Sequence, residues 1–175
     1  MPVPRVCVFT VFDHFDQGWW ARYANEMERT GLRFAVHFHH CQHAVIQAAR
    51  RHPMCCGIME ENDPTVPLTE QHGYRVFQHI AGLRQFDWAL ELDPDEVLEP
   101  DGPLRLQALV HYENVDWLRV AVTGFTSEVR LYNLHARHWT VPQDSWLRLP
   151  HRKEVADKFN LTIQWVPDES VATKS

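Results

Sequence analysis

Positions 87–96 of the chain read Asp87-Trp88-Ala89-Leu90-Glu91-Leu92-Asp93-Pro94-Asp95-Glu96. The mostly apolar first part predicts a buried strand. The strand runs directly into Asp93, Asp95 and Glu96, and three acids this close repel one another unless a cation or hydrogen bonds compensate. Pro94 stiffens the turn between them. The stretch therefore predicts a strand that delivers carboxylates to a divalent metal such as Mg²⁺ or Mn²⁺, and the alternative is a solvated acidic turn that caps the next element.

The residues before this stretch alternate between strand and helix patterns. The predicted strands are Val6–Phe12, Phe34–His39 and Cys56–Glu60, and the predicted helices are Trp19–Arg29, Ala44–Arg51 and Thr69–Gln85. Such an order predicts an α/β fold with a mostly parallel central sheet flanked by helices. Ligands of these sheets bind at the carboxyl ends of the strands. Asp13 and Asp93 both follow predicted strands, so we expect them in one crevice.

The second part of the chain is less regular. Leu104–Tyr112 predicts a helix, and Asp116–Val122 and Glu128–Leu134 predict two strands of a hairpin. Residues 139–149 show no clear period, and the polar tail at 168–175 is expected to be flexible.

Composition narrows the class of protein. The 175 residues, 45% hydrophobic and 23% charged, fit one globular domain. A net charge of −6 disfavours nucleic acid as a constitutive partner, because phosphate contacts require a basic surface. No apolar run approaches the ~18 residues of a membrane span, and Met1–Arg5 lacks the order of a signal peptide. The four cysteines match no disulfide framework, so we expect a cytoplasmic protein.

Phe86–Pro100 resembles the Asp-x-Asp region of glycosyltransferases of the GT-A fold, in particular the family 2-like enzymes. In those, an apolar strand ends in Asp-x-Asp-Glu, although Glu91 is acidic where the family's strand is usually apolar. Phe12–Val36 is similar to the opening of that family, with a strand, a polar nucleotide-binding loop and a helix with an aromatic stripe. Glu128–Tyr132, followed by Trp139 and His151, resembles its later part.

The resemblance implies a single GT-A-like, Rossmann-type domain over residues 1–167. Residues 1–100 would form the nucleotide-sugar-binding half, and residues 101–167 an abbreviated acceptor half. It also implies the donor site. Thr10, Phe12 and Asp13 would line the nucleoside pocket, Asp93 would contact the ribose or the metal, Asp95 would hold Mn²⁺ or Mg²⁺ on the diphosphate, and His151 would complete the metal shell. The donor would be a UDP- or GDP-sugar, and the acceptor a hydroxyl group of unidentified origin.

An inverting sugar transfer needs a carboxylate that deprotonates the acceptor hydroxyl. The candidates are Glu128, Asp144 and Glu154. Asp144 stands slightly ahead because it lies in an irregular loop between two tryptophans, whose rings suit sugar faces. A turn-capping role at residues 143–145 explains Asp144 more simply than a catalytic one.

Two other functions remain open. His37 and His39 share one predicted strand face, and Cys41 and His43 follow closely, so these four residues could bind zinc. One strand cannot readily wrap four ligands around a tetrahedral ion, and a histidine-rich strand end is more often a polar rim of the sheet. The other alternative is a shortened GT-A-like module that binds a nucleotide sugar without catalysis.

Overall fold

The computed structural model describes residues 3–112, 115–122, 126–135, 154–156 and 162–165. Its strands are β1 (Val6–Asp13), β2 (Arg33–His39), β3 (Cys55–Glu61), β4 (Trp88–Glu91), β5 (Glu96–Leu98), β6 (Trp117–Val122), β7 (Thr126–Asn133), β8 (Glu154–Ala156) and β9 (Thr162–Trp165). Its α-helices are α1 (Trp20–Thr30), α2 (His43–Arg51), α3 (Glu70–Leu83) and α4 (Gly102–Arg105), and its 3-10 helices are η1 (His14–Trp19) and η2 (Leu106–Tyr112).

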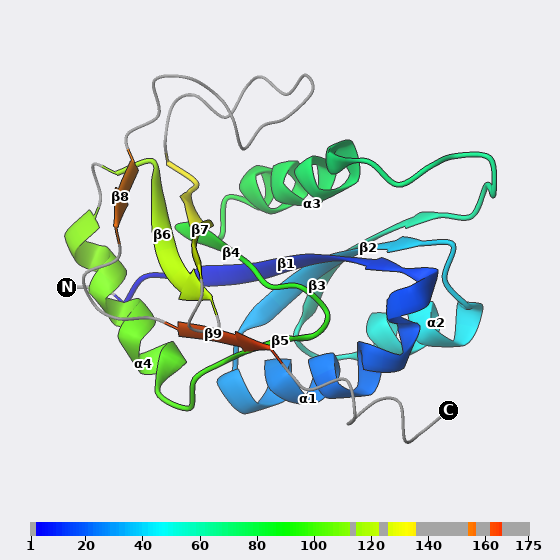
Figure 1. Cartoon of the computed structure of the whole chain (residues 1–175), viewed down its shortest axis with the longest axis horizontal. Coiled ribbons are helices and arrows are strands. Elements are labelled where there is room, and N and C mark those ends of the chain that lie inside the picture. Colours follow the sequence, from blue (N-terminus) through cyan, green and yellow to red (C-terminus); the bar gives the residue numbers. More distant parts are fainter. Residues whose placement is uncertain (1–2, 113–114, 123–125, 136–153, 157–161, 166–175) are drawn as a thin grey trace.

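Within these ranges the strands form one mixed sheet in the order β3-β2-β1-β4-β7-β6-β9-β5, with β8 paired to β6 (Figure 1). Strands β3, β2, β1 and β4 are parallel, as the alternating pattern predicts. The predicted α/β fold with a flanked, mostly parallel central sheet is therefore confirmed. Because β1 and β4 are neighbours, their carboxyl ends lie at the same edge of the sheet.

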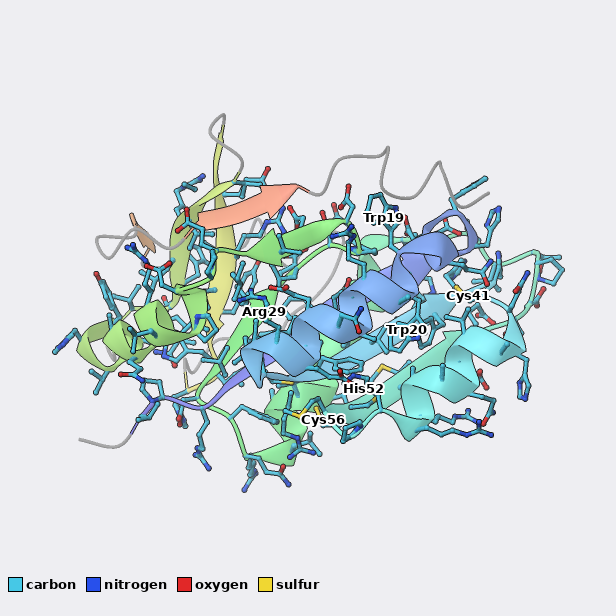
Figure 2. The ribbon with its side chains drawn as sticks, turned by 90° about the horizontal axis from the view of Figure 1, so that it is seen from below. Trp19, Trp20, Arg29, Cys41, His52 and Cys56 are labelled. Carbon is cyan, nitrogen blue, oxygen red and sulfur yellow. The ribbon has the colours of Figure 1, made fainter. Side chains whose placement is uncertain are left out.

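Helices cover both faces of the parallel half. Figure 1 shows α3 on one face and α1 and α2 on the other. The strands alternate accordingly: Phe34, Val36 and Phe38 of β2 belong to the core beneath α1 and α2, whereas Ala35 belongs to the core beneath α3. Figure 2 views the molecule from the α1 and α2 side, and there α1 and α2 lie next to each other.

Trp20 and His52 close the space between α1 and α2 (Figure 2). Their ring centroids are 6.4 Å apart, and His52 Nε2 lies 3.2 Å from the carbonyl oxygen of Ala24 on α1. His52 follows the last residue of α2, so this contact joins the end of one helix to the middle of the other.

The antiparallel half follows the predicted hairpin. Strands β6 and β7 pair antiparallel, and β7 also pairs antiparallel with β4. The predicted helix over 104–112 is confirmed, with α4 at its start and the 3-10 helix η2 over the rest. Strand β5 was not predicted, because three residues are too few for a periodic signal.

Side chains of α1 hold β5 in place. Glu26, which is buried, accepts a hydrogen bond from the Leu98 amide at 3.1 Å and pairs with Arg29. Arg29, labelled in Figure 2, donates to the Leu98 carbonyl oxygen at 3.1 Å. In the part of the chain that the structure describes, no helix combines the length and the hydropathy that a membrane crossing demands.

Two glycines give opposite predictions for stability. Gly31 ends α1 with φ 69°, a left-handed conformation that disfavours a side chain, whereas Gly82 lies within α3 with open space around its Cα. We expect Gly31→Ala to lower the free energy of unfolding by about 1 kcal/mol. Gly82→Ala should raise it by about 0.5–1 kcal/mol, because alanine has the higher helix propensity. Urea unfolding followed by circular dichroism measures both, and equal effects of the two changes would contradict the assigned conformations.

Candidate functional site

A cavity of about 430 Å³ opens at the carboxyl edge of the parallel strands. Its wall consists of residues from β1, from the start of α3 and from the end of β4: Phe9, Thr10, Val11, Leu68, Thr69, Glu70, Gly73, Glu91 and Asp93. This is the edge at which α/β sheets bind ligands. The sequence predicted the two strands that form it, but not the contribution of α3.

Asp93 presents its carboxylate at this cavity. Desolvation of its carboxylate by the surrounding protein raises the pKa of Asp93 to about 7, repulsion from Glu96 adds to the shift and Arg130 opposes it, although the side chain is 55% exposed. A site of this kind attracts a cation.

Arg130 of β7 organises the acids at this edge. It makes a two-pronged ion pair with buried Glu96, at 2.6 and 3.0 Å, and contacts Glu128 at 2.7 Å and Asp93 at 3.8 Å. Burial works against its charge, but the hydrogen bond with Glu96 and the charges of Asp93 and Glu96 together raise the pKa of Arg130. The guanidinium therefore stays charged and sets the position of the acidic turn. The sequence predicts Glu96 among the carboxylates that face a metal. In the structure its side chain is buried and pairs with Arg130 instead.

Glu91 is a cavity residue that sequence reasoning did not select. The Tyr132 hydroxyl donates to Glu91 Oε2 at 3.0 Å, and burial raises the pKa of Glu91 above its usual range. The sequence feature that could have identified Glu91 is an acidic residue in an otherwise apolar strand. An isolated acid of that kind does not reveal whether it faces a cavity or an ion-pair partner.

The residues predicted to line a nucleoside pocket separate in the structure. Thr10 lies on the cavity wall, and its Oγ1 is buried without a hydrogen-bond partner. Phe12 is fully buried among Trp20, Tyr23 and Phe38, so it belongs to the core.

Asp13 acts locally at the end of β1. Its carboxylate accepts from the His14 amide at 2.6 Å and starts η1 as part of a capping box with Asp16. It is not among the residues that line the cavity, although β1 does end at the expected edge.

The structure describes two of the three predicted metal ligands, Asp93 and Asp95. Asp95 is half-buried next to Asp93, and His151 lies outside the described residues. The donor chemistry fits Mg²⁺ or Mn²⁺, since both ions prefer carboxylate oxygens and leave positions for phosphate and water. Among the described residues, the one group of three or more potential metal ligands that lie close together is His37, His39 and His72. No third protein ligand therefore joins Asp93 and Asp95 in the described part of the chain.

Of the three predicted catalytic bases, one has a described side chain. Glu128 is half-exposed and ion-paired with Arg130 at 2.7 Å. Asp144 lies outside the described residues. Glu154 begins β8, and the structure describes its backbone but not its side chain.

The four residues of the zinc hypothesis do not come together. His37 and His39 point to the α3 face, where they meet His72. Cys41, labelled in Figure 2, lies on the opposite face, where its thiol donates to the Phe12 carbonyl oxygen at 3.4 Å. His43 is exposed at the start of α2. The proposed set is therefore wrong in two of its four members.

The fold and this edge define an α/β protein with a cavity lined in part by acidic residues. Comparison with family models and with curated proteins finds no match. Among solved structures, the chain is similar to S. aureus TarS, with a TM-score of 0.49 and 9% identity over 71% of this chain and 22% of that one. It is also similar to TarS residues 1–349 in complex with UDP-GlcNAc, with a TM-score of 0.49 and 8% identity over 70% of this chain and 36% of that one. The chain thus spans about a third or less of these TarS chains.

The Arg130–Glu96 pair gives a prediction about stability. Arg130→Met leaves the Glu96 carboxylate buried and unpaired, so we expect a loss of about 3–5 kcal/mol in the free energy of unfolding. Arg105→Met, which removes a partly exposed pair with Asp101 on α4, should cost about 0.5 kcal/mol or less. Chemical denaturation compares the two.

A second change separates charge from packing. Adding Glu96→Gln to Arg130→Met removes the buried charge and should recover part of the lost stability. If the double variant is no more stable than Arg130→Met, the unpaired carboxylate is not the cause.

Proposed function

We propose that this chain is a metal-dependent glycosyltransferase that transfers a sugar from a nucleoside-diphosphate sugar to a hydroxyl acceptor. The observation that carries the proposal is the cavity at the carboxyl ends of β1 and β4, with Asp93 on its wall. The sequence resemblance of 86–100 to the Asp-x-Asp region supports the same assignment.

The charge of the cavity supports a metal requirement. Glu70, Glu91 and Asp93 contribute carboxylates to its wall. A diphosphate repels these groups, so donor binding needs a cation between them. Asp93 and Asp95 would hold the Mn²⁺ or Mg²⁺ ion, which acts as a Lewis acid on the departing diphosphate.

The surrounding residues shape the donor site. Arg130 holds the turn through Glu96, which also accepts a hydrogen bond from the Asp93 amide at 2.6 Å. Gly73 on α3 keeps one wall open, since a Cβ there would lie 3.8 Å from Val11 and any longer side chain would fill the cavity.

For the acceptor half, we add Glu91 to the candidate bases Glu128, Asp144 and Glu154. A base that takes a proton from a hydroxyl works best when its pKa is near the operating pH. Burial raises the pKa of Glu91, and the residue lies on the cavity wall, whereas Glu128 is held by Arg130. Because the ion pair with Arg130 makes Glu128 a poorer base, it also favours the second candidate function, a module that binds the nucleotide sugar without catalysing its transfer.

Calorimetric titration tests the donor site. UDP-GlcNAc, the ligand named for the TarS complex, UDP-glucose and GDP-mannose are each titrated with Mn²⁺ and with EDTA. We expect Mn²⁺-dependent binding of one donor, weakened about tenfold or more by Asp93→Asn because a metal ligand is lost. Gly73→Leu should also abolish binding by filling the cavity.

Asp101→Asn on α4 is the matched control, because it removes an exposed aspartate away from the cavity and should leave binding unchanged. Donor hydrolysis or transfer, followed by release of the nucleotide, then separates an enzyme from a binding module. Failure of every donor to bind in the presence of Mn²⁺ would overturn the proposal.

A further inference from the structure

We propose that His37, His39 and His72 form a second metal site, separate from the acidic edge, that binds a transition metal ion preferring imidazole, with zinc as the first candidate. The site joins β2 to the first turn of α3. It does not depend on the proposed glycosyltransferase function.

The three imidazoles converge from two elements. His37 and His39 lie two residues apart on β2 and so share the face beneath α3, and His72 descends on them from α3. Ring centroids are 4.5 Å apart for His37 and His72, and 4.8 Å apart for His39 and His72. One ligand atom from each ring lies within 4.8 Å of the others.

The spacing suits a small tetrahedral ion. His37 Nε2 and His39 Nδ1 are 3.1 Å apart. Two nitrogens bound to tetrahedral zinc at about 2.0–2.1 Å lie about 3.3 Å from each other. The two nitrogens thus already lie at about the separation that one ion requires, and an ion between them would replace the hydrogen bond that now joins them. His72, whose ligand atom lies within 4.8 Å of the others, needs to approach them.

Hydrogen bonds to the backbone orient two of the rings, His39 and His72. His39 Nε2 lies 2.9 Å from the Val66 carbonyl oxygen, which can only accept, so Nε2 carries the proton and Nδ1 is free of one. His72 Nδ1 accepts from the Thr69 amide at 3.1 Å and also lies 3.2 Å from the Thr69 carbonyl oxygen. Metal binding through Nε2 therefore requires the other tautomer, in which Nδ1 carries the proton and donates to that carbonyl oxygen. Carbonyl partners of this kind orient metal-bound histidines in many proteins.

The surroundings keep the rings neutral and enclosed. The three residues are 2–5% exposed, and the burial and mutual proximity of the rings hold the pKa values of His37 and His72 below their usual range. The carboxylate of Glu61 offsets part of a cation's charge, while Arg75 opposes it. Imidazole nitrogens select zinc, copper or nickel over Mg²⁺ and Mn²⁺, so the two metal sites should not exchange ions.

The site lies behind the wall of the cavity. Val11 and Thr69 both line the cavity. Val11 is paired with His37 across the β1–β2 ladder, and the Thr69 amide donates a hydrogen bond to the His72 ring. A bound ion would therefore fix the start of α3 against the sheet, which is the part of the cavity wall that comes from outside the strands.

Metal titration of the untagged full chain tests the site. After dialysis against EDTA, zinc is added in competition with a chromogenic chelator, and Co²⁺ is added in a parallel sample to read the coordination geometry from its visible spectrum. We expect one equivalent of zinc, a higher melting temperature with zinc, and the intense absorption of tetrahedral cobalt. Stoichiometry well below one equivalent, or an octahedral cobalt spectrum, would overturn the proposal.

Variants locate the ligands. His37→Gln, His39→Gln and His72→Gln should each weaken zinc binding about tenfold or more, while the exposed His43→Gln is the matched control and should bind like the parent. Asp93→Asn should bind zinc normally, which separates this site from the donor site. Circular dichroism of the metal-free variants verifies folding, and if any one of them fails to fold the other two still decide the result. Equal zinc affinity in the folded triad variants and in His43→Gln would place the metal elsewhere.

Discussion

The buried ion pair between Arg130 and Glu96 holds the two halves of the sheet together at the edge where the cavity opens. Arg130 belongs to β7 in the antiparallel half, and Glu96 opens β5 just after the acidic turn of the parallel half. Glu96 also accepts from the Asp93 amide, so one carboxylate sets the path of the turn and the position of the arginine. A buried pair of this kind is weak evidence for stability, but removing either partner is costly. Its consequence is geometric, since it aims Asp93 at the cavity.

The opposite sides of the sheet have distinct roles. Beneath α1 and α2, β1 and β2 contribute aromatic and aliphatic side chains to a closed core. Beneath α3, the same strands contribute Val11, His37 and His39, and β4 contributes Glu91. Apolar residues of the same strands, among them Phe9 and Ala35, also form a core beneath α3, so the polar side chains on that face lie beside packed ones.

The first turn of α3 connects the two candidate sites. Thr69 and Gly73 line the cavity, and His72 between them faces His37 and His39. Thr69 begins the helix in a capping box with His72, so the residue that meets the other histidines also satisfies the helix end. The position of this turn sets part of the cavity wall, so the histidine cluster and the cavity share one structural element.

The sequence by itself determined the class of fold, because periods of two and 3.6 and the glycine after α1 are local properties of the chain. It also placed Asp93 at the end of a buried strand of the parallel sheet, whereas the pairing of that strand with β1 came from the structure. Only the tertiary structure decided which polar side chains meet. Glu96 pairs with Arg130 thirty-four residues later, and His72 joins His37 and His39 across more than thirty residues. Pairings at that separation leave no periodic signal in one sequence, because they depend on how α3 and β7 pack on the sheet.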